Sequence, residues 1–508
     1  MPEEKIEDTG LLDDQFLIKY VQTNITKLEF LGKDSKSKIK ELNDKIDTVD
    51  NKSLNNKDLV KLIVPTWGNL LQDAIHTLKH NDFREQIHWK EYNSNAARDI
   101  NNQFVFGIDK LCSYFIKFSE FEKILYGADG RYRDHVVHVF RVWLVGMYLL
   151  LKDNAIDKLE IDVPFKDGHY YNRKEIMAMW SIIALCHDLG YPLEKTEKIN
   201  DSVEKMFEEL GKISIQKFAF SFQPEHQYIN KFLLDFLSSK LIEIKLEDDE
   251  KEKERIKTVE KIKAIASEPE KYSQIDVGIK EDSNRTIAKL LGQKSFSTKI
   301  QAKYYLKYAK SLENYNHGII SCSILIKALI YFLESDYNMQ ENNHLSIEDA
   351  RQFLIRREIL RAIASHTCPE IYHLKVNTLS FLLILCDELQ EWGRPRFEEL
   401  QNNVSGIEYV KLSQYELNAV SYTIRYKGEI NDKEFAEHKF QQWHKILRTA
   451  VDDLSRTFKM EVSLEFPRAN YKFSYESGTL SVETNEGGGN WKVWPIYNFD
   501  KMVSSRKG

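Results

Sequence analysis

The sequence predicts a mainly α-helical protein: a helical bundle with a charged helical insertion, followed by a small α+β lobe at the C-terminus. Three observations lead to this prediction. Apolar residues recur at helical spacing from about residue 131 to 400. An unbroken charged run, EDDEKEKER at 247–255, falls inside that stretch. Apolar and polar residues alternate with the period of a strand only after about residue 400.

Length and composition describe an ordinary globular chain that is long enough for several lobes. It has 508 residues, of which 42% are hydrophobic and 30% are charged. A chain of this length predicts about two to four domains. We divide it into an N-terminal helical region (1–100), a helical core (101–400, with the insertion at about 195–310) and a C-terminal lobe (401–508).

Charge and cysteine content narrow the expected location and partners. The net charge of −6 disfavours binding to long nucleic acids, which contact basic surfaces. The acidic N-terminus does not resemble a secretory signal, and no run of 18 apolar residues predicts a membrane span. We therefore expect a cytoplasmic protein with reduced cysteines that pack in the core. The cysteines are Cys112, Cys186, Cys322, Cys368 and Cys386.

The N-terminal region contains weakly amphipathic helical sequence. Residues 1 to about 60 are polar, and we expect them to form a loosely attached helical arm. Residues 61–130 include stronger amphipathic stretches such as LVKLIVPTWGNLLQDAIHTL. Pro65 lies within that stretch, and we expect it at a helix start or break.

Four apolar helical runs in the core each carry histidine or aspartate on the apolar side. In the first run, for example, His138, Val142, Val145 and Leu149 follow the spacing of one helix face. A buried imidazole or carboxylate is costly unless it is paired or bound to a metal. The pattern therefore predicts one metal site inside the bundle. The residues concerned are His138, His187, Asp188, His366 and Asp387.

The C-terminal lobe alternates strands with one helix. Segments 408–420, 421–430, 459–466 and 479–484 have the alternation of strands. Between them, 433–458 has the spacing of an amphipathic helix. The glycines at 487–489 predict a loop, because no strand-to-helix context makes them a phosphate-binding motif.

Imidazole and carboxylate together are ligands for Mn²⁺, Fe²⁺, Co²⁺, Ni²⁺, Zn²⁺ or Mg²⁺. Four such ligands leave coordination positions for water and substrate. An ion bound in this way makes water nucleophilic near neutral pH and polarises a phosphoryl oxygen. We therefore expect a divalent cofactor, either one ion or two.

These motifs resemble the HD superfamily of metal-dependent phosphohydrolases over about residues 100–400. The resemblance lies in HVFRV at His138, CHDLGYP at His187 and Asp188, and ILCDEL at Asp387. It implies that these four residues bind one metal, with Asp188 also orienting or deprotonating the attacking water. It also implies that residues 101–400 form an HD phosphohydrolase domain.

Three further histidines are catalytic candidates. NHGIISCSIL at His317 and AIASHT at His366 resemble later elements of the superfamily. These two side chains could complete a second metal position, or they could contact phosphate or act as general acid. His135 lies about one turn before His138 and is a candidate for supporting a ligand or contacting substrate.

Cations and one aromatic residue flank the predicted ligands. A phosphate substrate needs positive charge near the metal, and an aromatic ring could pack on a sugar or base. The candidates for substrate binding are Arg131, Arg133, Tyr191, Lys195, Arg394 and Arg396.

The resemblance leaves the substrate open. The chain lacks the HDxxHxGxxN, HHE…GYP and Gly-His-rich continuations of particular subfamilies. The favoured substrates are (deoxy)nucleoside triphosphates, by analogy with larger members in which extra lobes bind a nucleotide effector or form a homo-oligomer. A phosphodiesterase for cyclic nucleotides or short oligonucleotides is the alternative, and a non-catalytic nucleotide sensor is an alternative of another class. A role in antiviral defence stays open.

Overall fold

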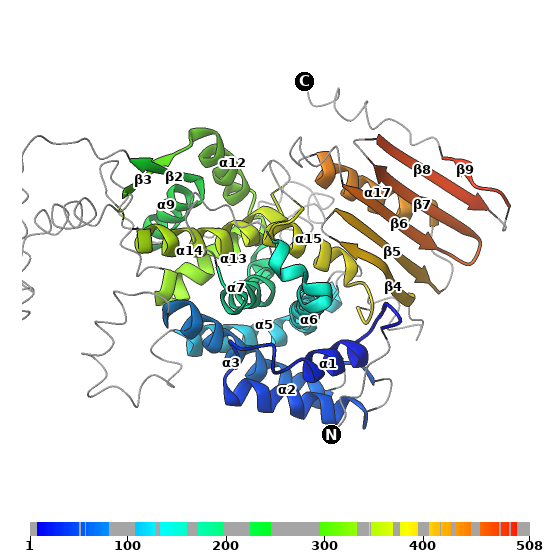
Figure 1. The fold of residues 1–508 in the computed structure, drawn as a ribbon, viewed down its shortest axis with the longest axis horizontal. Coiled ribbons are helices and arrows are strands. Elements are labelled where there is room, and N and C mark those ends of the chain that lie inside the picture. Colours follow the sequence, from blue (N-terminus) through cyan, green and yellow to red (C-terminus); the bar gives the residue numbers. More distant parts are fainter. Residues whose placement is uncertain are drawn as a thin grey trace, which may run out of the picture.

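The computed structural model is mainly helical, with a mixed sheet at the C-terminal end (Figure 1). Helices occupy the left and centre of that view, and the large sheet stands at the right. The structure describes residues 8–49, 52–55, 57–80, 107–128, 133–159, 171–196, 224–244, 295–332, 345, 347–368, 376–394, 406–416, 418–427, 432–448, 458–476, 479–486 and 489–494.

The central bundle is built from the helices whose sequences carry the histidines and aspartates. Its member α7 is largely buried, begins with a capping box formed by Asn172 and Glu175, and ends where the His-Asp pair begins. The helices of the bundle are α5 (Ile108–Ala128), α6 (Val136–Leu151), α7 (Arg173–Cys186), α9 (Pro224–Ser238), α12 (Ala302–Glu313), α13 (His317–Ala328), α14 (Ile347–His366) and α15 (Leu379–Leu389). Short 3-10 turns, η3 (Lys152–Lys158) and η5 (Ile330–Phe332), follow α6 and α13.

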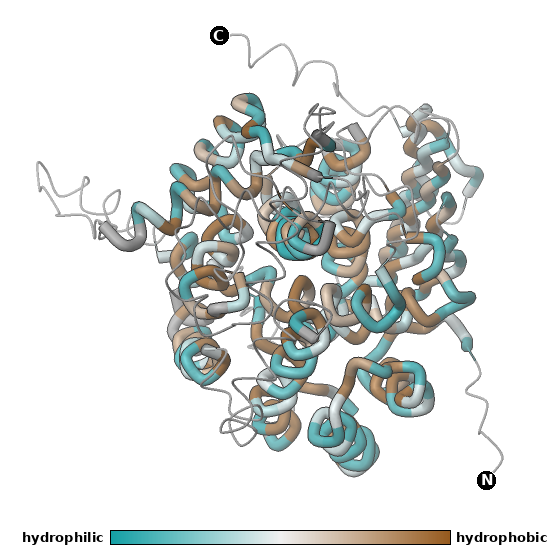
Figure 2. The backbone as a smooth tube through the Cα atoms, turned by 60° about the vertical axis from the view of Figure 1, so that its left-hand side comes forward, coloured by the Kyte–Doolittle hydropathy of each residue, from teal (hydrophilic) through white to brown (hydrophobic). Residues whose placement is uncertain are grey.

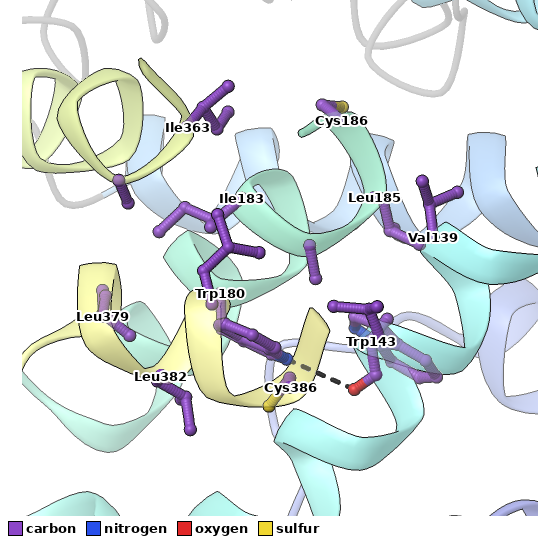
Figure 3. Packing of buried hydrophobic residues seen from close by; sticks show 14 of the residues in the cluster. Val139, Trp143, Trp180, Ile183, Leu185, Cys186, Ile363, Leu379, Leu382 and Cys386 are labelled. Carbon is purple, nitrogen blue, oxygen red and sulfur yellow. Dashed lines mark hydrogen bonds between the residues drawn. The ribbon is translucent and has the colours of Figure 1, made fainter. Parts of the chain in front are cut away.

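Large apolar side chains hold α6, α7, α14 and α15 together (Figure 3). Trp143 and Trp180 are both fully buried, and the indole of Trp180 donates a hydrogen bond of 3.2 Å to the carbonyl of Trp143. A Cβ at Gly146 would overlap the Trp180 ring at 2.0 Å, so only glycine lets α6 approach α7 this closely. This packing fixes the helix ends that carry the polar residues.

The stretch Arg173–Thr196 is long and apolar enough to cross a membrane, but 83% of its apolar window is buried inside the protein. Such burial is typical of the core helix of a soluble domain. In Figure 2, helices at the edge of the molecule carry both hydrophobic and hydrophilic residues on their turns.

The N-terminal region is packed on the bundle, so the expectation of a loosely attached arm is wrong. It contains β1 (Leu11–Leu12), α1 (Asp14–Thr23), α2 (Lys33–Ile46) and α3 (Lys57–His80). Asp14 is buried and accepts two hydrogen bonds of 2.7 Å from the fully buried Arg141 of α6. β1 pairs with the C-terminal sheet. Pro65 lies inside α3 instead of at a helix start or break.

Part of the predicted insertion belongs to the packed core. Within 195–310, α9 packs on α12, α13 and α14, and its Leu233 and Leu237 are fully buried. The same range contains two strands, β2 (Ser239–Ile244) and β3 (Ser295–Ile300), which pair antiparallel and were not predicted. The expectation of an entirely helical insertion is therefore wrong for these residues. The charged run 247–255 lies outside the described residues.

The C-terminal lobe is a mixed sheet with one covering helix. Its strands are β4 (Ile407–Glu416), β5 (Ala419–Tyr426), β6 (Lys459–Glu465), β7 (Ala469–Glu476), β8 (Thr479–Glu486) and β9 (Lys492–Val493), and β1 extends it beside β4. β5 and β6 are parallel and are joined through α17 (Asp432–Arg448), whereas the other pairs are antiparallel. The predicted strand 408–420 is in fact β4, a turn and the start of β5.

Candidate metal centre

Seven histidine and aspartate side chains meet at one place where helix ends converge. His138 lies in the first turn of α6, and His187 and Asp188 follow the last turn of α7. His317 is the first residue of α13, and His366 is the last of α14. The set is completed by Asp387 in the last turn of α15 and by His135, directly before α6.

His138 is held at both ring nitrogens by one turn of α15. Its Nε2 lies 2.9 Å from Asp387 Oδ1, and its Nδ1 lies 2.5 Å from Gln390 Oε1. The amide nitrogen of Gln390 donates to the carbonyl of Trp392 at 2.7 Å, which turns the amide oxygen toward the imidazole. Nδ1 of His138 therefore faces the amide oxygen, and Nε2 faces the carboxylates.

His187 is oriented by the backbone of its own helix. Its Nδ1 donates to the carbonyl of Ala184 at 2.8 Å. Its Nε2 is buried, lies 3.4 Å from Asp188 Oδ2 and has no hydrogen-bond partner in the described part of the chain. A buried nitrogen lone pair without a donor is rare in proteins and suits a metal ligand.

Asp188 is the centre of the cluster, with its two oxygens facing different histidines. Oδ2 accepts a hydrogen bond of 2.7 Å from Nδ1 of His135 and lies 3.7 Å from Nε2 of His138. Oδ1 lies 3.3 Å from Nε2 of His317 and 3.7 Å from Nε2 of His366. This arrangement lets one carboxylate face two groups of nitrogen ligands.

His317 and His366 are oriented in the same way as the first pair. Nδ1 of His317 donates to Glu194 Oε2 at 2.6 Å, and Nδ1 of His366 donates to the carbonyl of Ile363, also at 2.6 Å. Their Nε2 atoms consequently point inward, 3.2 Å from each other. Two lone pairs at this distance need a proton or a cation between them.

Three overlapping groups of ligand atoms are compact enough to hold a metal ion. In each group the atoms lie within 4.8 Å of one another. The groups are His138 with His187 and Asp188, His187 with His366 and Asp387, and Asp188 with His317 and His366. Imidazole nitrogens anchored through Nδ1, together with carboxylate oxygens, fit a divalent first-row metal or Mg²⁺.

The electrostatics favour charged carboxylates and neutral imidazoles at His187 and His135. Burial opposes ionisation of Asp188, but the surrounding imidazoles hold its pKa well below the usual range. The pKa of Asp387 is likewise lowered, because contact with His138 outweighs burial. Burial lowers the pKa of His187 to about 4 and that of His135 to about 3. Neutral imidazole is the form that binds metal.

His317 differs from the other histidines in its charge state. Burial alone would lower its pKa, but hydrogen bonds to Asp188 and Glu194 outweigh burial and raise the pKa to about 9. Its side chain is also 19% exposed, whereas those of His138 and His187 are 1% and 0% exposed. The cluster is thus sealed at His138 and His187 and more open at His317.

The predicted substrate-binding residues have different environments. Tyr191 packs on His135 with ring centroids 3.5 Å apart and ring planes tilted by 32°, and Lys195 Nζ lies 5.3 Å from the centre of the Tyr191 ring. Arg394 donates to the carbonyl of Asp134 at 3.1 Å. Arg133 forms an ion pair of 2.6 Å with Glu391, so its charge is already neutralised. Arg131 and Arg396 lie outside the described residues.

Two residues that orient the ligands were not predicted from the sequence. Glu194 lies six residues after Asp188 and accepts from His317 through both ring and backbone nitrogens. Gln390 lies three residues after Asp387, which places both on one helix face. The spacing of Gln390 is a local signal that could have been used. Glu194 pairs with a residue far away in the chain, so no local pattern predicts it.

The cysteines next to the ligands belong to the apolar core. Cys186 and Cys386 are fully buried among apolar side chains (Figure 3). Burial raises the pKa of both thiols well above the usual value. Protonated thiols are poor metal ligands, so the site depends on nitrogen and oxygen.

No family model, curated protein or solved structure matches this chain.

Proposed function

We propose that this protein is a metal-dependent phosphohydrolase of the HD superfamily that acts on nucleotides. One observation carries the proposal. Four histidines from separate helices direct Nε2 toward the buried Asp188 or the partly exposed Asp387, and each has its Nδ1 hydrogen-bonded to a protein oxygen. Such preorganisation orients ligands for a metal and is more than a folded core requires.

A divalent ion in this cluster would polarise a phosphoryl oxygen and make a nearby water nucleophilic. We assign Asp188 as the acceptor for the proton of this water. Asp188 is kept ionised by the surrounding imidazoles and is fixed in place by the hydrogen bond from His135. Because His135 stays neutral down to a pH of about 3, that hydrogen bond persists over the physiological range.

Leaving-group protonation is assigned to the open side of the cluster. His317 is the most exposed of these four imidazoles, and Glu194 anchors its Nδ1. A protonated imidazole in this position can donate from Nε2 to a departing phosphate oxygen. Lys195, beside Tyr191, and Arg394, beside Asp134, are the described cations that we assign to the phosphates. We assign Tyr191, which packs on His135, to contact with a sugar or base.

The preferred substrates are (deoxy)nucleoside triphosphates. The second candidate is a phosphodiesterase that acts on cyclic nucleotides or short oligonucleotides. The group formed by Asp188, His317 and His366 favours it, because a second ion there would suit a two-metal displacement. In that case His317 would be a ligand instead of the general acid.

The test is a product assay with purified protein and Mn²⁺, Co²⁺ or Mg²⁺. Nucleoside triphosphates, singly and pooled, are compared with cyclic nucleotides and short oligonucleotides. We expect release of tripolyphosphate or pyrophosphate, lost in Asp188→Ala. Cleavage of diesters alone would favour the second candidate. No cleavage of any substrate by protein with bound metal would contradict both.

The control variant is Lys433→Ala. Lys433 is an exposed residue of α17 and is not part of the metal cluster. The activity of Lys433→Ala should equal that of the wild type. Loss of activity in Asp188→Ala then reports on the site and not on the protein preparation.

A further inference from the structure

A buried ion network connects the C-terminal lobe to the turn that holds His138. Lys439 of α17 is only 5% exposed. Its Nζ lies 2.5 Å from Glu388 Oε2 and 2.6 Å from Glu391 Oε1. Arg133 completes the network, donating to the other oxygen of Glu391 at 2.6 Å. This network lies outside the ligand set and has no part in the chemistry proposed above.

The turn that ends α15 has two functional faces. Asp387 and Gln390, three residues apart, contact the two ring nitrogens of His138. Glu388 and Glu391, also three residues apart, face Lys439. One side of this turn therefore holds a candidate metal ligand, while the other is held by a side chain from the lobe.

The charges explain why the turn needs Lys439. Asp387, Glu388 and Glu391 place three carboxylates within five residues, and like charges in a buried setting repel. Lys439 and Arg133 are the described cations that contact Glu388 and Glu391. A buried carboxylate left without its partner is strongly destabilising, so loss of Lys439 should displace the turn, admit water or protonate Glu388.

We propose that Lys439 is a positioning residue for the half of the metal centre formed by His138 and Asp387. Docking of the C-terminal lobe and binding of a cation at this half are then coupled, and the coupling acts in both directions. Binding of a cation at this half rests on the proposed function. Positioning of the turn by Lys439 is a property of the protein without metal.

The first measurement is hydrogen exchange in metal-free protein. The variants are Lys439→Met, the conservative Lys439→Arg and the matched control Lys433→Met from the exposed side of the same helix. In Lys439→Met we expect at least fivefold faster exchange in peptides that cover 379–394 and 133–142. Lys439→Arg should restore slow exchange, and Lys433→Met should equal the wild type. Faster exchange confined to the lobe, or no change, would overturn the inference.

The second measurement is Co²⁺ binding, followed by calorimetry and by the visible spectrum of the bound ion. Loss of a nearby positive charge would by itself tighten binding of a cation. Loss of positioning instead weakens it, and we expect at least tenfold weaker binding and an altered spectrum in Lys439→Met. Tighter binding would overturn the proposed coupling. A wild type that binds no Co²⁺ would instead contradict the proposed function, and the exchange result would still decide whether Lys439 positions the turn.

If Lys439→Met does not fold, Glu391→Gln takes its place. This variant keeps the ion pair between Lys439 and Glu388 and removes only one charge from the network. The same peptides should then exchange faster, by a smaller factor. Unchanged exchange in these peptides would overturn the inference.

Discussion

The two halves of the candidate metal centre use the same residue types in different surroundings. In the inner half, His138 and His187 are almost fully buried, and their Nδ1 atoms donate to neutral oxygens. In the outer half, His317 is partly exposed and its Nδ1 donates to the carboxylate of Glu194. A carboxylate partner favours protonated imidazole and a neutral partner does not. The inner half is therefore suited to a resident ion, and the outer half to a proton or a second ion.

The largest expected effect is on the amount of bound metal, which should differ between variants of the inner half and variants of the outer half. Asp387→Asn removes an anionic ligand of the inner half, and we expect loss of both tight metal binding and activity, by about a thousandfold or more. His317→Gln should leave one ion bound, because the inner ligands remain. Metal analysis after dialysis checks both variants. Equal metal loss in the two would show that the halves are not separable.

The next effect concerns the support of the inner half by the N-terminal region. Asp14→Ala leaves the buried Arg141 without its carboxylate, and we expect the free energy of unfolding to fall by about 3 to 5 kcal/mol. Urea denaturation measures this change. Asp13→Ala removes only the exposed N-cap contact of α1 and should cost about 1 kcal/mol. Similar losses in the two variants would contradict a special role for the buried pair.

A third prediction uses the pH dependence of the outer half in metal-free protein. The pKa of His317 is raised from 6.5 to about 9, so the folded state binds this proton more tightly than the unfolded state. The resulting stability is fully present below pH 6.5 and is lost as the pH rises through 9, by on the order of 3 kcal/mol. Thermal unfolding in chelator at pH 6 and pH 9.5 measures it. Glu194→Gln should reduce the difference; an equal difference would refute the assignment.

The smallest effect tests the neutral anchor of the inner half. Gln390→Met removes the acceptor for Nδ1 of His138 while keeping the side-chain length. We expect metal affinity to fall by about 10- to 100-fold without loss of the site. Calorimetric titration checks this, with Gln414→Met on the surface of β4 as control. Unchanged affinity would show that the amide does not orient the ligand.

Several features could be predicted from the sequence because they depend on local spacing. The helices around His138, His187, His366 and Asp387 follow from apolar periodicity, as does α17. The mainly helical class and the C-terminal sheet are confirmed. The prediction from alternating apolar and polar residues was wrong where a turn was short, because β4 and the start of β5 were predicted as one strand.

What the sequence by itself determined is therefore the helices and the choice of polar residues placed on their buried sides. Only the tertiary structure decided which ring nitrogen of each histidine faces the centre, because its partner can lie far away in the chain, as Glu194 does for His317 and Gln390 for His138. It also decided that Asp14 and Lys439, from opposite ends of the chain, reach the same turn after Asp387. Side-chain hydrogen bonds and ion pairs act over about 3 Å of space, whereas sequence patterns record only distance along the chain.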